Sequence, residues 1–217
     1  MSVNPVIITA IKPHKKSKSQ VDLYVDGNLS LTLSSTVVDR SGIHSGQTLS
    51  DSDVETLKQS DSIQRAFDRS IQYLSYRPRS KSEIQRKLQQ LKFDNLIIEK
   101  VITRLSDLGH VNDVSFTSFW KENRQSFSPR SSARLAQELR QKGISPDTIT
   151  ESISDVDDEE TAYRATEKKA RVLATKPFPE FQKKLRSFLL YRGFNYQVIE
   201  ITIKKLWQEN NCEDKND

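Results

Sequence analysis

The sequence predicts a mostly α-helical protein in which three tandem three-helix repeats form an elongated curved array, preceded by a small antiparallel β subdomain. Three observations lead to this fold class. A block of 22 residues occurs three times, its apolar positions have helical spacing, and the residues before the repeats alternate between apolar and polar as strands do.

The three copies of the block span residues 84–105, 135–156 and 185–206. Their apolar residues fall into six aligned columns, and all 18 positions are apolar in a chain that is only 35% apolar. The columns are Ile84, Leu135 and Leu185; Leu88, Leu139 and Leu189; Phe93, Ile144 and Phe194; Ile98, Ile149 and Ile199; Ile102, Ile153 and Ile203; and Leu105, Val156 and Leu206. The period of 51 and then 50 residues leaves room for about three short helices in each repeat.

The middle of each block predicts a turn between two amphipathic helices. Gly143 and Gly193 precede the third column in the second and third copies, and a left-handed glycine there can end one helix and lead into the next. Lys92 holds the same place in the first copy, so we expect that turn to be strained or built differently. Stacking of neighbouring repeats would cover the apolar face that each helix pair exposes.

The first 60 residues predict the β subdomain. Apolar and polar residues alternate over 21–25 and again over 29–33, on both sides of Asp26-Gly27, which is a strong hairpin signal. Residues 50–53, with their carboxylates, predict the start of the next helix. The β subdomain is too small to bury much apolar surface alone, so we expect it to pack on the helical region.

Helix-start signals divide the remainder. Ser80 and Glu83 have the spacing of a capping box, and Asn112 precedes another predicted helix. The expected parts are a β-rich N-terminal subdomain (1–60), helical repeat 1 (61–111), helical repeat 2 (112–160), helical repeat 3 (161–207) and a disordered polar tail (208–217).

Composition excludes several classes of protein. The chain has no apolar run close to the roughly 20 residues that a membrane helix needs, and no secretory signal follows Met1. Its single cysteine, Cys212, cannot form an internal disulfide, which is typical of a reducing compartment. We expect a soluble cytoplasmic monomer.

The sequence contains no recognisable catalytic, metal or cofactor site. His14, His44 and His110 are scattered, with no carboxylate or cysteine at metal-ligand spacing. Phosphate-loop, dinucleotide-binding and nucleophile-elbow motifs are missing. The carboxylates of residues 155–160 could in principle hold a metal ion, but a solvated linker between repeats is the commoner fate of such a run. We therefore predict no enzyme activity and no cofactor.

The charged residues are unevenly distributed along a chain of net charge +5. Eight basic and two acidic residues lie between Arg65 and Lys92, and nine and two between Arg164 and Arg192, whereas residues 147–160 hold seven carboxylates and no basic residue. Two basic zones predict a polyanion or an acidic protein surface as partner. Ordinary solvated helix faces are the alternative interpretation.

Basic residues recur beside the middle helix of every repeat and are the candidate partner-binding or DNA-binding residues. Arginine suits this task because its planar fork pairs bidentately with carboxylate or phosphate. If the repeats stack with a small rotation, these residues would form one continuous basic strip. The candidates are Arg77, Arg79, Arg86 and Lys87 in repeat 1, Arg124, Arg130, Arg134, Arg140 and Lys142 in repeat 2, and Lys184, Arg186 and Arg192 in repeat 3.

Four tyrosines lie near the candidate residues in the sequence: Tyr73, Tyr76, Tyr191 and Tyr196. Their rings could stack on bases or anchor a protein interface. Packing between helices, with the hydroxyl at the surface, is an equally good interpretation.

Several short motifs resemble those of the RecX family of RecA recombinase regulators. They are SARLAQELRQKGI at 132–144, KLRSFLLYRGF at 184–194, the turn Arg77-Pro78-Arg79-Ser80, and Asn112-Asp113 followed by Phe116. The resemblance covers roughly residues 63–207, and the N-terminal β-like segment resembles an extension that some members carry. Two positions depart from the family pattern, because Ser131 and Lys92 stand where members usually have glycine.

The resemblance implies a body of tandem three-helix units and a protein that binds RecA. Such a protein lodges in the groove of the RecA filament on single-stranded DNA and inhibits its recombinase, ATPase and co-protease activities, in DNA repair and SOS-response control. We expect contact with single-stranded DNA through the filament and only weak direct binding of DNA. The alternative is a non-catalytic helical nucleic-acid-binding module without a recombinase partner, in which phosphate contacts dominate the affinity.

Overall fold

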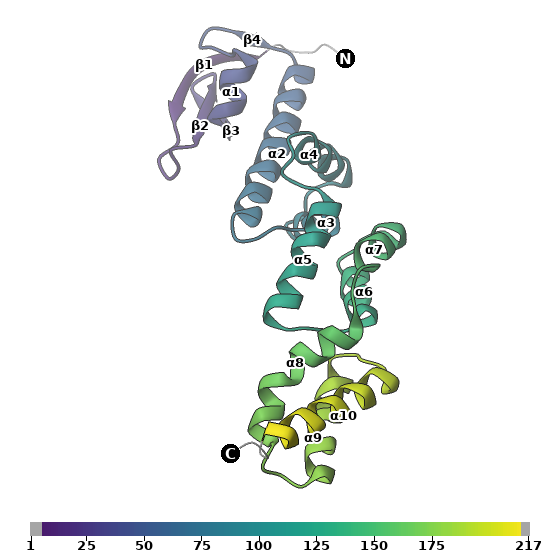
Figure 1. The fold of residues 1–217 in the computed structure, drawn as a ribbon. Coiled ribbons are helices and arrows are strands. Elements are labelled where there is room, and N and C mark those ends of the chain that lie inside the picture. The colour runs from purple at the N-terminus through teal and green to yellow at the C-terminus, as the bar shows by residue number, and fades with distance from the viewer. Residues whose placement is uncertain (1–5, 214–217) are drawn as a thin grey trace. The chain divides into compact units, whose positions relative to one another are not determined.

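The computed structural model describes residues 6–213, which fall into two compact units (Figure 1). Within this range the first unit comprises residues 6–78 and 84–111, and the second comprises residues 79–83 and 112–213. The chain is mostly helical, with a small antiparallel sheet near its N-terminus. The predicted fold class is therefore confirmed.

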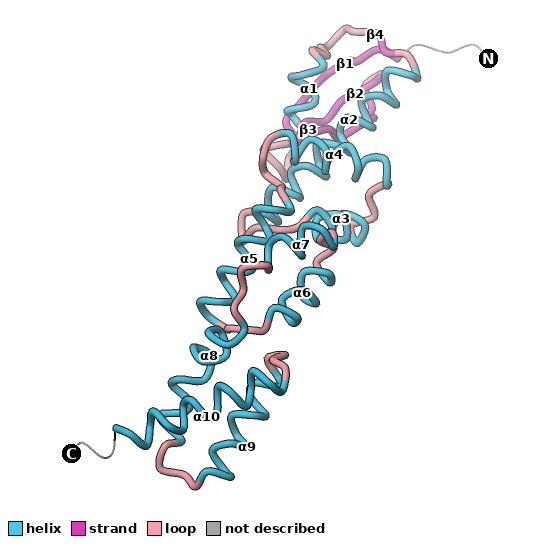
Figure 2. The backbone as a smooth tube through the Cα atoms, turned by 45° about the vertical axis from the view of Figure 1, so that its right-hand side comes forward, coloured by secondary structure: helices cyan, strands magenta, loops and turns pink. Residues whose placement is uncertain are grey.

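Four strands form the antiparallel sheet of the first unit, in the order β3-β2-β1-β4 (Figure 2). They are β1 (Val6–Pro13), β2 (Gln20–Val25), β3 (Asn28–Ser34) and β4 (Thr48–Leu49). The predicted hairpin connects β2 to β3 through Asp26 and Gly27, whose φ angles are 49° and 79°. Positive φ at both residues is what a two-residue turn matching the strand twist requires.

The first unit continues with α1 (Ser35–Ser41), α2 (Asp51–Leu74), α3 (Lys81–Gln90) and α4 (Asn95–Asp107). Helix α2 joins the sheet to the helical repeat, because Leu57 is buried in the core of the sheet and Ala66 in the core formed with α3 and α4. Buried Asp61 of α2 also accepts a hydrogen bond from the backbone amide of Ser34 at 2.6 Å. The sheet therefore packs on the helices as expected, and the expected boundary at residues 60 and 61 lies inside α2.

The second unit contains the complete second and third repeats. Its helices are α5 (Asp113–Phe127), α6 (Ser132–Gln141), α7 (Pro146–Ile153), α8 (Asp158–Leu173), α9 (Phe178–Tyr191) and α10 (Tyr196–Glu213). Helix α10 includes residues 208–213 of the segment expected to be a disordered tail, and the rest of that segment lies outside the described residues.

The six apolar columns form the core of the repeats, as predicted. Phe93, Ile102, Ile153 and Val156 are half-buried, and every other column residue is buried. The turns at Gly143 and Gly193 have the predicted left-handed backbone, with φ of 77° and 90°. Lys92 also has a left-handed backbone, with φ of 62°. The first turn is therefore built like the other two, and it is strained because a residue with a side chain holds this conformation.

Each turn is closed by the same pair of hydrogen bonds. In the second repeat the amide of Gly143 donates to the carbonyl of Arg140 at 2.9 Å, and the amide of Ile144 donates to the carbonyl of Leu139 at 3.1 Å. This bonding ends a helix at a left-handed residue and brings the apolar side chains before and after the turn together. The second and third columns, here Leu139 and Ile144, therefore lie in one core.

Neighbouring repeats meet at two junctions of the same design, both within the second unit. Ser80 precedes α3 and donates its hydroxyl to the carbonyl of Lys142 at the end of α6, at 2.6 Å. Ser131 precedes α6 and donates to the carbonyl of Gly193 at the end of α9, at 2.7 Å. Each hydroxyl also accepts from the amide three residues further along its own helix, at 3.2 Å. One serine thus caps a helix start and binds a helix end of the next repeat.

A carboxylate in the first turn of a later helix completes each junction. Asp113 of α5 accepts a hydrogen bond from the amide of Lys81 at 2.9 Å, and Asp158 of α8 accepts one from the amide of Ser132 at 2.7 Å. Both amides belong to the first turn of a middle helix, where they lack partners inside the helix. The acidic run 155–160, expected to be a solvated linker, therefore supplies a structural carboxylate.

The junctions also explain where glycine is required. A Cβ at Gly143 would overlap the Cβ of Ser82, and a Cβ at Gly193 would lie 2.7 Å from the Cβ of Arg134. Lys92 has the same backbone conformation but an exposed side chain. Glycine at residues 143 and 193 therefore permits both the left-handed φ and the close contact with a neighbouring side chain. Lys92 has the left-handed φ but no such close contact to accommodate.

We predict that Gly143→Ala destabilises the protein by about 2–4 kcal/mol, because left-handed backbone strain adds to overpacking against Ser82. Gly109→Ala is the matched control, since Gly109 also has positive φ (71°) but nothing lies within 4 Å of a Cβ there. Urea denaturation followed by circular dichroism should give a loss of only about 1 kcal/mol for the control. Equal losses for the two variants would show that close approach at residue 143 contributes nothing.

Candidate interaction surface

Glu138 binds two of the candidate arginines in the second unit. Its carboxylate accepts from Nε of Arg124 at 2.7 Å and lies 3.0 Å from Nε of Arg130. It also accepts from the indole N–H of Trp120 at 3.0 Å, and the Arg124 guanidinium stacks over that indole at 4.5 Å. The Glu138 side chain is only 13% exposed. Arg124 and Arg130 are therefore fixed by contacts within the protein.

Lys142 lies next to this cluster. Its Nζ donates to Glu83 at 2.8 Å and lies 4.8 Å from the centroid of the Trp120 ring. The Glu83 side chain is 8% exposed, so the lysine satisfies a carboxylate that would be costly to bury alone. The junction through Ser80 therefore has an ion pair beside it.

The basic candidates of the third repeat are bound in a similar way. Arg186 pairs with Glu200 of α10 at 2.6 Å, and exposed Lys184 pairs with Glu180 one turn away on α9 at 2.7 Å. The hydrogen bond from Lys184 lowers the pKa of the Glu180 carboxyl. These pairs join α9 to α10 and extend along α9 itself.

Arg192 forms part of the second junction. Its Nη1 donates to the carbonyl of Pro129 at 2.6 Å, and its guanidinium stacks over Phe188 at 4.4 Å. Burial, together with the neighbouring positive charge of Arg130, lowers the pKa of the Arg192 guanidinium. A guanidinium remains charged despite such a shift, because its ordinary pKa lies far above neutral pH.

Two candidates of the second repeat lack a carboxylate partner among the described residues. Arg140 is exposed on α6. Arg134 is half-buried, and its Nη1 donates to the side-chain oxygen of Gln137 at 2.8 Å. The aliphatic part of Arg134 covers Gly193 at the second junction. Arg140 is thus the more accessible of these two guanidinium groups.

The remaining candidates lie just before α3, where Arg77 and Arg79 stand, and in its second half, which holds Arg86 and Lys87. Arg77 donates from Nη1 to the carbonyl of Pro78 at 2.8 Å, and Nζ of Lys87 lies 5.9 Å from the centroid of the Tyr73 ring. Arg79 is half-buried and Arg86 is exposed. All four have interactions within the protein.

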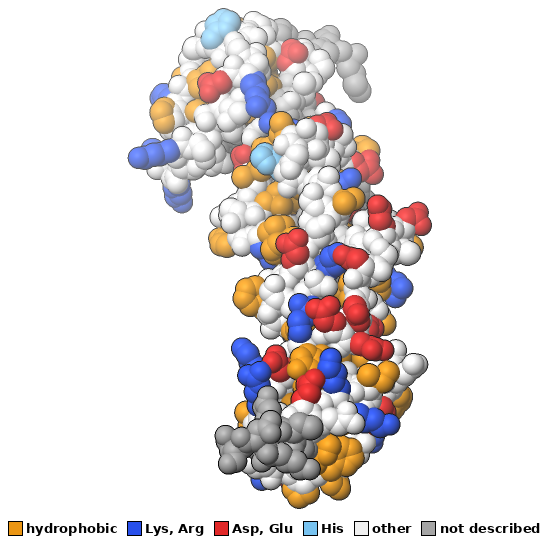
Figure 3. Space-filling view, in the orientation of Figure 1, with side chains coloured by type: hydrophobic (Ala, Val, Ile, Leu, Met, Phe, Trp, Pro, Cys, Tyr) orange, Lys and Arg blue, Asp and Glu red, His pale blue; other side chains and the backbone are white. Residues whose placement is uncertain are grey.

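Within the part of the chain that the structure describes, at least five of the candidate residues therefore have a carboxylate partner in the protein itself: Arg124, Arg130, Lys142, Lys184 and Arg186. Basic and acidic side chains lie next to one another on the face of the second unit seen in Figure 3. These pairs form a surface of mixed charge, because their carboxylates lie between the basic side chains. The role of the twelve candidates in binding a partner stays a prediction.

Sequence reasoning did not single out Glu138 or Trp120. Glu138 stands next to Leu139, which lies in the buried stripe of α6. A carboxylate near a buried stripe requires a polar partner, so the position of Glu138 in the sequence could have identified it. The sequence could not have identified Trp120 as that partner, because Trp120 is on a separate helix and helix packing brings the two side chains together.

Among residues 6–210, no group of three or more histidine, cysteine, aspartate or glutamate residues lies close enough together to hold a metal ion. None of the helices described between residues 6 and 213 has the length and apolar character of a membrane-spanning segment.

Three family models match the chain. They describe the first, second and third three-helix domains of RecX, and they match residues 66–105, 112–153 and 157–203. Together these matches cover more than half of the 217 residues. Their order along the chain is that of the three repeats.

Curated relatives agree with the family models. The chain is 27% identical to the regulatory protein RecX of Bacillus velezensis over 212 residues, which are 95% of this chain and 80% of the relative. It is 28% identical to the regulatory protein RecX of Bacillus subtilis over 209 residues, covering 94% and 78% of the two chains. These matches include most of the N-terminal β subdomain as well as the repeats.

Two solved structures have a similar fold. A crystal structure of a regulatory protein RecX matches with a TM-score of 0.69 at 22% identity, over 91% of this chain and 98% of the other. The crystal structure of RecX from Lactobacillus salivarius matches with a TM-score of 0.58 at 25% identity, over 68% and 97%.

We predict that Glu138→Gln lowers the free energy of unfolding by about 1–3 kcal/mol, because Arg124 and Arg130 then face each other without a neutralising carboxylate. Glu122→Gln, at an exposed position on α5, removes the same charge and should have little effect. Denaturation midpoints measured for both variants test this. Equal denaturation midpoints for Glu138→Gln and Glu122→Gln would mean that the Glu138 carboxylate does not hold Arg124 and Arg130 in place.

Proposed function

Because this chain belongs to the RecX family, we propose that it is a regulatory protein that binds RecA and mainly inhibits its activities. The target is the RecA filament on single-stranded DNA, and the inhibited activities are recombination, ATP hydrolysis and co-protease function. The protein thereby acts in DNA repair and in control of the SOS response. The observation that carries the proposal is the match of all three RecX domain models, in order, to the three repeats.

The construction of the repeats supports a mechanism by occupancy rather than by chemistry. Helix caps, hydrogen bonds and a close glycine contact fix the third repeat against the second, so the second unit can present residues of both repeats to one target. A filament repeats its subunits, and a protein made of repeats can bridge neighbouring subunits. Occupying the filament groove would exclude duplex DNA and other substrates and favour a less active filament.

Exposed basic and aromatic side chains are suited to such an interface. Arg140 and Arg86 are exposed, as is Tyr191 at the end of α9, which is 73% exposed. Arginine and tyrosine are enriched at the energetically important positions of protein interfaces. We expect these residues to meet an acidic protein surface or the DNA inside the filament.

A direct nucleic-acid-binding module is the second candidate function, and one observation in the first unit favours it. Tyr73, Tyr76, Lys87 and Leu91 line a surface pocket of about 270 Å³, and Tyr76 is 76% exposed. An exposed aromatic ring beside cations can stack on a base while a cation binds the phosphate. A module of this kind would bind DNA without changing the activity of RecA.

We predict that substoichiometric amounts of the protein reduce the DNA-dependent ATP hydrolysis of RecA, and that Arg134→Glu combined with Arg140→Glu weakens this inhibition about tenfold by reversing charge at the interface. Arg192 is left unchanged because it donates to Pro129 within the second junction. Lys100→Glu, at an exposed position on α4, is the control for a change in overall charge.

Circular dichroism should show the same helicity for all variants. Unchanged inhibition by the double variant would remove these residues from the interface. Tight binding of single-stranded DNA with no effect on RecA hydrolysis would instead favour the nucleic-acid-binding module.

A further inference from the structure

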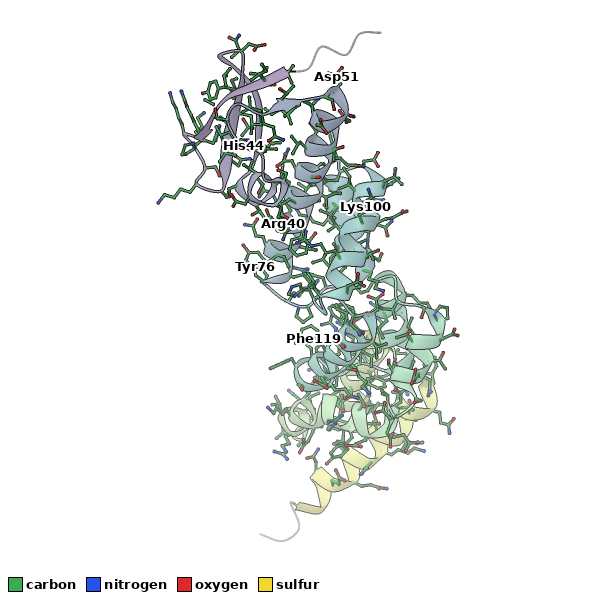
Figure 4. All side chains as sticks on the ribbon, turned by 90° about the horizontal axis from the view of Figure 1, so that it is seen from above. Arg40, His44, Asp51, Tyr76, Lys100 and Phe119 are labelled. Atoms are coloured by element: carbon green, nitrogen blue, oxygen red, sulfur yellow. The ribbon has the colours of Figure 1, made fainter. Side chains whose placement is uncertain are left out.

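Two arginines from separate helices converge on one amide oxygen in the first unit. Nη1 of Arg40, on α1, donates to Oε1 of Gln64 at 3.4 Å, and Nη1 of Arg104, on α4, donates to the same oxygen at 3.3 Å. Gln64 belongs to α2 and is 6% exposed. Arg40 lies beside α2 in Figure 4. The three residues therefore meet where α1, α2 and α4 come together.

Neither Arg40 nor Arg104 forms an ion pair with an acidic residue among the described residues. The nearby carboxylate of Asp68 accepts from the side-chain nitrogen of Gln64 at 2.8 Å, which points the amide oxygen at the arginines. Two like charges held close together repel unless an anion lies between or beside them.

A cavity opens beside the two guanidinium groups. Its volume is about 310 Å³, and Ser60 and Ile63 of α2 and Val37 of α1 line it together with the two arginines and Gln64. The Ser60 hydroxyl makes no hydrogen bond among the described residues. Each guanidinium has five N–H donors, of which Gln64 takes only one from each. The cavity therefore offers several hydrogen-bond donors and an apolar wall.

The position of Arg104 is fixed before any ligand binds. Its guanidinium stacks on the ring of Phe67 at 4.0 Å, which restricts the side chain to one orientation. A binding group that is already ordered loses less conformational entropy when a ligand arrives. Together with the buried amide, this makes the cavity a preorganised site for an oxyanion.

We propose that this cavity binds the phosphate group of a small phosphorylated molecule, such as a nucleotide. A tetrahedral phosphate presents oxygens in several directions and can accept from guanidinium groups on two different helices. At neutral pH it also carries more negative charge than a single carboxylate. The volume is at the lower end of the range for small-molecule sites. Val37 and Ile63 provide apolar surface for the carbon skeleton of the ligand.

The surrounding charges favour a small ligand over a nucleic-acid strand. Asp39 is exposed next to Arg40 on α1, and Asp61 and Asp68 lie on α2 on either side of Gln64 in the sequence. A polyanion needs a broad positive field along its backbone, which this mixed neighbourhood does not provide. A single phosphate needs only the two arginines and the serine.

The test uses the full-length protein with inorganic phosphate and adenosine monophosphate as probes, in thermal unfolding and isothermal titration calorimetry. Both probes should raise the unfolding temperature above that in chloride of equal ionic strength, because a ligand that binds only the folded state stabilises it. Arg40→Gln should weaken binding at least tenfold. Lys100→Gln, which removes an exposed positive charge from α4, should bind like the natural protein.

Arg104→Lys keeps the charge and removes the planar fork, so it should also weaken binding while circular dichroism confirms that the variant is folded. The proposal is overturned if phosphate and chloride give equal unfolding temperatures, or if Arg40→Gln binds as well as the natural protein. It is also overturned if acetate binds as tightly as phosphate. Binding only to a single-stranded oligonucleotide that lacks a terminal phosphate would assign the cavity to a nucleic-acid strand instead.

Discussion

The fold of the repeats depends on one polar contact, in which a serine hydroxyl joins the start of one middle helix to the end of the next. Ser80 and Ser131 accept from an amide of their own helix and donate to a carbonyl of the following repeat. The contact satisfies unpaired groups at both helix termini and places the positive end of one helix dipole against the negative end of another. Hydrophobic columns provide the core of each repeat, whereas these polar groups join the helix termini where residues of neighbouring repeats meet within the second unit.

The same contact explains why the repeats differ at the ends of the array. Lys92 has the left-handed backbone of Gly143 and Gly193 but carries a side chain, which no preceding repeat has to accommodate. In the third repeat, the residue before α9 is Pro177, which has no side-chain hydroxyl or carboxylate to cap the helix. Among the described residues, the serine contact therefore occurs at the middle helices α3 and α6 and not at α9.

The sequence was sufficient for features in which a residue's neighbours are close along the chain. Helical spacing identified the columns, and the left-handed turns and the Asp26-Gly27 hairpin depend on local backbone preferences. It was not sufficient for contacts between helices. Glu138 binds Arg124 and Arg130, and Gln64 binds Arg40 and Arg104, only because helix packing brings their side chains together. A periodic pattern of apolar residues shows which face of a helix is buried. It does not show which polar residue of another helix will lie beside that face.

The internal pairing of the basic residues changes how an interface built on them would work. An arginine bonded to Glu138 through Nε still has donors on its two terminal nitrogens, so a structural contact does not exclude an external one. Arg124 is ordered by Glu138 and by the ring of Trp120, and ordering in advance reduces the entropy lost on binding. Exposed Arg140 has no such support and would lose more side-chain freedom, although it needs to break no existing ion pair. An acidic partner would therefore gain from Arg140 mainly by charge, and from Arg124 mainly by geometry.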